Sequence, residues 1–498
     1  MFFFRTSNPR SRKSRCVAPF RSTKNRRLRL GWEALEARTV LSTVSWINAS
    51  GGDWSTPANW SGDAVPNVTQ DAIINIAVSG PITIDSADAA HSLTDTSASL
   101  DLTGGSLSLA AASSVSQNVT ISVHSVLASA GNLTIAGTLS ESGGVLTGGG
   151  TVTVNGLLTW TGGTMSGSGT TLAEGGLQLG DAAHSDIESL GARTFQNAGA
   201  ATWASKDTLD QSANSIFENL AHATLTVQSG VTWNAVNGSL DNQFQGTLTV
   251  KAGTGSASFN GFLSNEGDLE VKSGTLLLEA SGTVTGNTLV DAGATIQFGG
   301  TQYEFQLGAG LTGQGTVTFG APFARPDTIF DAGSAYSFSG ATNIQAGATA
   351  VFDAIASTET LNESGGDLGG SGTFTVAGMD TWTGGTMSGS GITNSLGGVT
   401  LGASGATQHN ETLAGRLLLN AGAGVWYGPD VLTQEESSTF LNYSNATLKI
   451  TGGATWGYDS LANDPLGTFE NNGAIIVAGG SAPTVVQPYF INSGKVEV

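Results

Sequence analysis

The chain has 498 residues, of which 71 are glycine, and charged residues make up only 12%. Residues 1–38 hold 11 of the 19 lysines and arginines and two acids, so the rest of the chain carries 8 basic and 37 acidic groups, a net charge of −29. Such an acidic body repels phosphates and argues against nucleic-acid binding. The single cysteine, Cys16, excludes disulfides and cysteine-based metal sites in the body.

Residues 1–42 form a basic tail that we expect to be disordered and to act in targeting. The tail lacks the apolar run of roughly 7–15 residues found in a conventional signal peptide. The pair Arg26-Arg27 lacks the apolar stretch that follows a twin-arginine signal. No run of about 18 apolar residues occurs in the sequence, so we predict no transmembrane segment.

The tail ends in "GWEALEARTVLS" (31–42). This stretch resembles the LEPR-XLL motif, which follows a basic tail in secreted and surface proteins of planctomycete-type bacteria. Alanine stands here in place of the motif's proline. The resemblance implies a secreted or cell-surface bacterial protein, exported by a non-classical, family-specific signal. The matching residues are Leu35, Glu36, Ala37, Arg38, Val40 and Leu41.

Residues 43–84 are rich in tryptophan, and we expect them to cap the fold. Three tryptophans lie close together in this segment and can form a compact aromatic plug over the first turn of the body. A plug would also cover strand edges that otherwise invite aggregation. The alternative is a small carbohydrate-binding patch. The pattern is similar to the start of autotransporter-like and adhesin-like β-helical proteins in bacteria. The residues that carry this likeness are Trp46, Trp54, Trp60, Pro66 and Asp71.

Residues 85–498 read as a repeat array. Short runs rich in Thr and Val alternate with period two and end at Gly, Asn or Asp, which predicts strands. Hairpin signals are few: Asn155-Gly156, Asn237-Gly238 and Asn260-Gly261. We therefore predict an all-β, repetitive solenoid, a parallel β-helix with turns of roughly 20–25 residues and about 18 turns. A right-handed coil is what the β-helical resemblance implies.

A large block of the array is duplicated. "TWTGGTMSGSG" occurs at Thr159–Gly169 and again at Thr381–Gly391, 222 positions later, and residues 138–271 recur at 360–498. We interpret the phrase as a strand end followed by a glycine-rich corner. Three tryptophan pairs recur with it, and we expect them to stack in or beside the core, with an exposed ladder for sugar rings as the alternative. These pairs are Trp160 with Trp382, Trp203 with Trp426, and Trp233 with Trp456.

The sequence offers no catalytic, cofactor-binding or metal-binding residue that we assign. The acidic pairs Asp207/Asp210 and Glu435/Glu436 read as solvated corners rather than the facing carboxylates of a glycosidase. The histidines share no metal-ligand spacing, and His184 and His409 read as solvent-facing turns. The basic residues are scattered singly: Arg193, Lys206, Lys251, Lys272, Arg325, Arg416, Lys449 and Lys495.

These features predict a non-catalytic, exported structural or adhesive cell-surface rod. It would make weak multivalent contacts, with polysaccharide or cell-envelope components as partners. The alternatives are a carbohydrate-active β-helix enzyme, either a polysaccharide lyase or a glycoside hydrolase, and a carbohydrate-binding module. Because the second copy stops at Val498 without a cap, we expect the chain to be a truncated part of a longer surface protein.

Overall fold

The computed structural model describes residues 42–183, 187–320, 327–405, 408–458, 467–479, 482–487 and 489–498. The basic tail, its LEPR-XLL-like motif, His184 and Arg325 therefore lie outside the described residues. One compact unit runs from Leu41 to Val498. Among the described residues, no helix is long and apolar enough to cross a bilayer.

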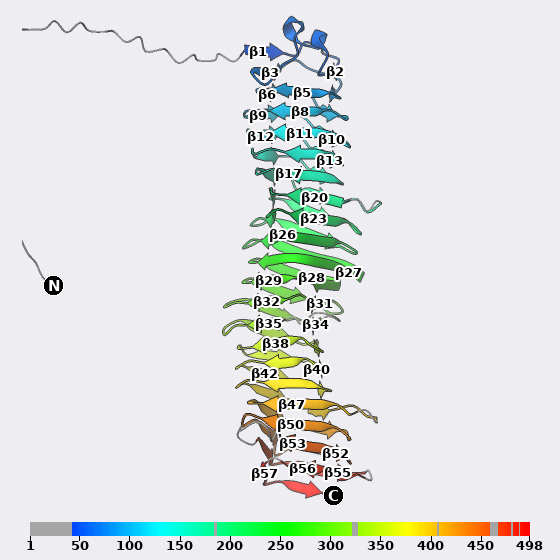
Figure 1. Cartoon of the computed structure of the whole chain (residues 1–498), viewed down its shortest axis with the longest axis vertical. Coiled ribbons are helices and arrows are strands. Elements are labelled where there is room, and N and C mark those ends of the chain that lie inside the picture. The colour runs from blue at the N-terminus through cyan, green and yellow to red at the C-terminus, as the bar shows by residue number, and fades with distance from the viewer. Residues whose placement is uncertain are drawn as a thin grey trace, which may run out of the picture. The chain divides into compact units, whose positions relative to one another are not determined.

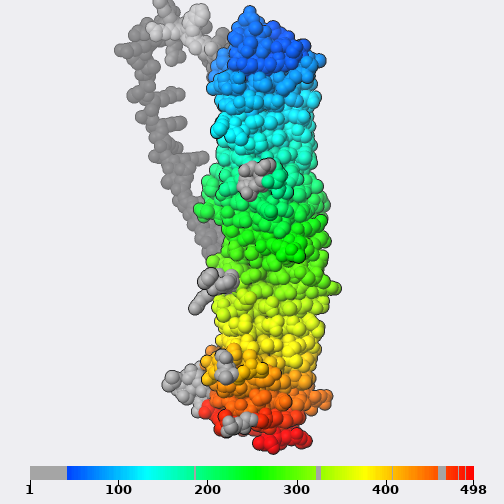
Figure 2. All heavy atoms as spheres, turned by 90° about the vertical axis from the view of Figure 1, so that its right-hand side faces the viewer, coloured from blue at the N-terminus to red at the C-terminus, as the bar shows by residue number. Residues whose placement is uncertain are grey.

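The unit is a parallel β-solenoid of about 19 turns, which confirms the predicted fold class (Figure 1). Its strands run from β1 (Ser42–Ser45) to β58 (Lys495–Glu497). The strand pairings are parallel: Leu139 lies beside Leu158, and Leu158 beside Leu177 one turn later. At about 4.8 Å per turn the stack is about 90 Å long. In Figure 2 the colour changes steadily along this column, because neighbouring turns are consecutive in sequence.

The turns vary in length at their corners, and the strand pairings shift in register at residues 234–239 and 250–256. The turn that brings Phe374 beside Ala356 is short, whereas the turn that brings Tyr336 beside Leu311 is clearly longer. The three hairpin signals do not form antiparallel hairpins, as the predicted parallel fold requires. Asn155-Gly156 lies in a corner after β15 (Val152–Val154), and the other two signals lie within the long strands β26 (Thr232–Asn242) and β27 (Thr247–Asn265). A residue with positive φ, such as Asn237, suits a corner as well as a hairpin.

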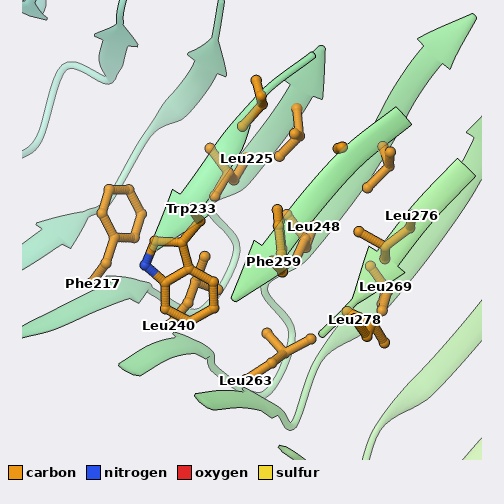
Figure 3. Close-up of a cluster of buried hydrophobic side chains, with 14 of the residues drawn as sticks. Phe217, Leu225, Trp233, Leu240, Leu248, Phe259, Leu263, Leu269, Leu276 and Leu278 are labelled. Carbon is orange, nitrogen blue, oxygen red and sulfur yellow. The ribbon is translucent and has the colours of Figure 1, made fainter. Parts of the chain in front are cut away.

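The core is a single apolar column inside the solenoid. Along each strand every second side chain points inward, as in β25 (Thr224–Gln228), where Leu225 and Val227 are buried. Inward side chains from successive turns then stack on one another. Figure 3 shows Phe217, Leu225, Trp233, Leu248 and Phe259 converging from four successive strands, the last two residues from β27. This stacking explains why apolar residues recur at matching places in successive turns.

The first turn holds the cluster of three tryptophans. Trp60 packs edge-to-face against Trp46 and Trp54, with ring centroids 5.0 and 4.7 Å apart. All three side chains are buried, and the Trp60 indole donates to the Trp54 carbonyl oxygen at 2.7 Å. The rings thus pack against one another, as an aromatic plug requires, and none is exposed as a platform for a sugar ring.

The duplicated phrase forms two strands joined by a glycine corner. In the first copy, β16 (Leu158–Trp160) ends at the tryptophan and β17 (Gly163–Ser166) carries Met165 into the core. Gly163 has φ +98°, and a Cβ there would collide with the backbone of Gly144 in the turn before. Gly385 repeats both features in the second copy. The repeated glycines therefore let successive turns approach closely.

The two copies lie on different faces of the solenoid. β19 (Leu177–Leu179) and β46 (Val399–Leu401) hold equivalent sequence positions. Following the strand pairings from β19 leads to β42 (Thr373–Val376) and β45 (Ile392–Ser395) instead of β46. The duplicated block is therefore not a whole number of turns, and its second copy is displaced by one face.

We predict that Gly163→Ala destabilises the solenoid more than Gly293→Ala. Both glycines have positive φ, so each substitution carries a backbone penalty of about 1 kcal/mol. Nothing lies within 4 Å of a Cβ at Gly293, whereas one at Gly163 meets backbone atoms that cannot rotate away. Urea denaturation followed by tryptophan fluorescence measures the difference. Equal urea midpoints for the two variants would show that the close approach of the backbone at Gly163 does not contribute to stability.

Candidate functional site

The paired tryptophans of the duplication belong to the core. Trp160, Trp203 and Trp233, and their partners Trp382, Trp426 and Trp456, are all 0% exposed. The expectation that they stack in the core is confirmed, and the exposed sugar ladder is wrong. The last pair also keeps its hydrogen bond in both copies: Trp233 donates to Gln211 at 2.5 Å and Trp456 to Gln434 at 2.9 Å.

Arg193 and Arg416, which the sequence shows as isolated basic residues, both lie in the interior. The guanidinium of Arg193 donates to the Thr171 hydroxyl at 2.7 Å and to the Ser166 and Thr170 carbonyls at 3.0 Å. Arg416 repeats the bond to a threonine hydroxyl, that of Thr393, at 2.8 Å. Each arginine thus ties together backbone groups from neighbouring turns.

Each buried arginine acts on a buried glutamate at the equivalent place in its copy. Burial raises the pKa of Glu141 well above the usual range, and the positive charge of Arg193 opposes that rise. Burial likewise raises the pKa of Glu363, with the carboxyl of Asp380 adding to the rise and Arg416 opposing it. Burial lowers the pKa of both arginines to about 10, so both stay charged at neutral pH.

Among the described residues, the second copy has a buried acid, Asp380, where the first copy has none. Asp380 accepts a hydrogen bond from the Ser395 hydroxyl at 2.6 Å, and burial raises the pKa of Asp380 to about 7. The equivalent residues of the first copy are the buried Leu158 and Ala173. A polar pair in one copy thus replaces an apolar pair in the other, at the same place in the core.

Two ladders of asparagines run along the axis, buried except for Asn492 at the end of the second, and sequence reasoning missed both. In the first ladder each side-chain amide donates to the side-chain oxygen of the next member, at 2.8, 2.8 and 2.7 Å. In the second ladder the distances are 2.8, 2.7 and 2.7 Å. The available signal was an asparagine that recurs at the end of a strand-like run in successive turns. The first ladder is Asn197, Asn219, Asn242 and Asn265; the second is Asn420, Asn442, Asn471 and Asn492.

The corner beside the first ladder is hollowed. The chain between β26 and β27, residues 243–246, and the chain after β32 (Gln302–Phe305), residues 306–309, are four-residue turns. Between them lie two-residue turns, Glu266-Gly267 and Thr285-Gly286. The short turns leave a groove of about 670 Å³, which we call the corner groove. It is lined by Phe244, Gln245, Glu266, Gly267, Asp268, Thr285, Gly286, Asn287 and Gly308.

The acidic pairs singled out in the sequence do not form one type of site. Asp207 is buried and accepts a hydrogen bond from the Trp203 indole at 3.1 Å, so its assignment to a solvated corner is wrong. Asp210 is partly exposed and accepts from Asn234 at 2.9 Å. Glu435 is partly exposed and Glu436 is exposed.

His409 also differs from its expected place. It is partly buried: its backbone amide donates to Asp430 at 2.6 Å, and its ring nitrogen lies 3.1 Å from the Thr383 carbonyl oxygen. Asp430 in turn lies beside Glu411, and burial followed by the Asp430 charge raises the pKa of Glu411. Across the described parts of the chain, no group of three or more His, Cys, Asp and Glu side chains is arranged to hold a metal ion.

No protein-family model, curated protein or solved structure matches this chain.

We predict that Arg193→Met destabilises the protein by about 3–5 kcal/mol, because it leaves buried carbonyls without a donor and Glu141 without a compensating charge. Lys251→Met is the matched control, since Lys251 is exposed. Urea denaturation monitored by tryptophan fluorescence compares the two. If the midpoint of Arg193→Met changed as little as that of Lys251→Met, a structural role for the buried arginine would be refuted.

We predict that the double variant Asp380→Leu/Ser395→Ala, which installs the residues of the first copy, flattens the dependence of stability on pH. The folded state raises the pKa of Asp380 from near 4 to about 7, so this carboxyl favours folding most below pH 4. That contribution is lost as the pH rises through about 7, at most about 4 kcal/mol. The double variant lacks this loss and should be the more stable protein at pH 8.

The single variant Ser395→Ala controls for the loss of the hydroxyl. The hydrogen bond from Ser395 lowers the pKa of Asp380, so its removal should make the pH dependence steeper. Urea midpoints measured from pH 4 to pH 8 distinguish the three proteins. If the urea midpoint of the double variant changed with pH as much as that of the wild type, Asp380 would not titrate in this range.

Proposed function

We propose that this protein is an exported, non-catalytic structural or adhesive rod of the bacterial cell surface. The observation that carries the proposal is the continuous parallel strand stack of about 19 turns, reinforced inside by two axial asparagine ladders. Each turn is hydrogen-bonded to the next along the whole length, which makes a stiff spacer. A rod of about 90 Å holds whatever lies at one end away from the other.

Charge supports the same proposal. The chain after residue 38 carries 8 basic and 37 acidic residues, so neighbouring rods repel one another and stay separate. Several acids are buried inside the core, among them Glu141 and Glu363 beside their arginines. Their placement on stacked strands of the interior fits a role in holding turns together better than a role in catalysis.

Carbohydrate binding is the second candidate function, and the corner groove favours it. The tryptophans considered for sugar stacking are buried, so any such activity rests on other residues. Phe244 is one: it is 67% exposed and lies against two hollows of about 340 and 670 Å³. A glycan-binding rod is still an adhesive rod, and the two proposals are compatible.

Export is tested in cells that produce the full chain. We predict that replacing Leu35, Glu36 and Arg38 together by alanine keeps the protein inside, because these residues carry the resemblance to the export motif. The control replaces Ser7, Asn8 and Ser11, which lie in the tail outside that motif. Protease accessibility on intact cells and immunoblots of the medium measure the outcome. Equal export of both variants would refute the role of the motif, and a wild-type protein found only inside would refute the surface rod.

A further inference from the structure

A groove with an exposed aromatic wall lies along one corner of the solenoid. Phe244 stands on the four-residue turn at one end, and Leu307, 77% exposed, stands on the four-residue turn at the other. The floor between them is Gly267 and Gly286, where a Cβ would collide with the backbone of the turn before. Three turn spacings separate the two ends, about 14 Å. The groove therefore spans four successive corners and runs parallel to the rod axis.

The walls of the groove carry carboxylate and amide groups. Asn287 donates to Asp268 at 3.2 Å across adjacent turns, and both side chains are exposed. Glu266 lines both the corner groove and the neighbouring hollow of about 340 Å³, which also contains Asp241 and Gln243. Phe244 is shared by the two hollows as well. No lysine or arginine is among the lining residues of either hollow.

The backbone beneath the groove is held by hydrogen bonds of the first asparagine ladder. Asn242 and Asn265, immediately before the first two turns of the groove, belong to the first asparagine ladder. The side chain of Asn242 donates to Asn265 at 2.7 Å and to the Asp268 carbonyl oxygen at 3.1 Å. These bonds fix the backbone from which Phe244, Glu266 and Asp268 project, so little ordering is needed when a ligand binds.

We propose that the corner groove binds an uncharged polysaccharide chain lying along the rod axis, with Phe244 as its stacking platform. The aromatic face packs against the C–H face of a sugar ring, while hydroxyl groups donate to the carboxylates and accept from the amides. The length of about 14 Å, three turn spacings, fits a few consecutive sugar rings. The acidic walls repel polyuronates and nucleic acids. This inference rests on the adhesive-rod proposal and names the chemistry of its partner.

The test measures binding of the full-length protein to soluble uncharged glucans, mannans, xylans and galactans, by affinity electrophoresis and by calorimetry. The wild type should bind at least one of them at physiological salt, and Phe244→Ala should weaken that binding roughly tenfold or more. Tyr443→Ala is the matched control. Tyr443 is 50% exposed on the turn after Asn442 of the second ladder, where it lines neither hollow, and its loss should leave binding unchanged.

Asn287→Ala provides a second variant that removes one amide and leaves the aromatic ring in place, and it should weaken the same binding. Circular dichroism and urea midpoints confirm that each variant is folded. No binding to any of the uncharged polysaccharides would overturn the groove proposal. It would leave the surface-rod proposal unaffected, because that proposal is tested by export. Binding that survives Phe244→Ala would place the glycan elsewhere, and equally tight binding of polygalacturonate would refute the charge argument.

Discussion

Every feature of this protein depends on the register between one turn of backbone and the next. The amide of Leu139 donates to Leu157 at 3.2 Å and that of Leu158 donates to Gly176 at 3.1 Å, and the same pattern continues along the stack. Register fixes which side chains point inward, since a slip by one residue would turn a whole strand inside out. Insertions are therefore confined to corners, where an extra residue changes the surface and leaves the ladder intact.

Register also explains how charged and polar groups can be buried in so apolar a core. Stacked turns place equivalent positions directly above one another, so an asparagine at one corner meets an asparagine of the next turn and satisfies its hydrogen bonds. Arg193 reaches carbonyls of two successive turns for the same reason. A buried ion near its partner adds little net stability by itself, but an unmatched one is strongly destabilising. Such groups therefore favour a single alignment of the turns over a shifted one.

The duplication shows how this constraint shapes sequence divergence. The arginine, its threonine partner and the buried glutamate are kept in both copies, although the copies lie on different faces. Two neighbouring positions differ together between the copies: Leu158 corresponds to Asp380, and Ala173 corresponds to Ser395, which donates to Asp380. Because the second copy is displaced by one face, copying the block extends the rod without repeating the same surface on the same side.

Much of the fold follows from the sequence, because alternation with period two and a long recurring block indicate a β-solenoid directly. The buried polar residues are harder to predict. Asparagine favours corners as well as ladders, so the sequence alone does not show that Asn242 belongs to a ladder whereas Asn237 adopts a positive φ. Arg193 and Arg416 look like surface residues until register places them inside. The burial of Asp207 escapes sequence reasoning for the same reason.

The groove beside the first ladder could not be foreseen at all, because it is a relation between turns. A uniform solenoid presents nearly the same profile at every level, so a molecule approaching it finds no preferred place. The surface becomes hollowed only where the corner length changes. Such a change occurs between the four-residue corner of Phe244, the two-residue corners Glu266-Gly267 and Thr285-Gly286, and the four-residue corner of Leu307. Two long corners bracketing two short ones create a hollow that no single turn contains. Specific recognition by such a rod therefore depends on departures from its repeat, and the repeat supplies the rigidity that makes those departures useful.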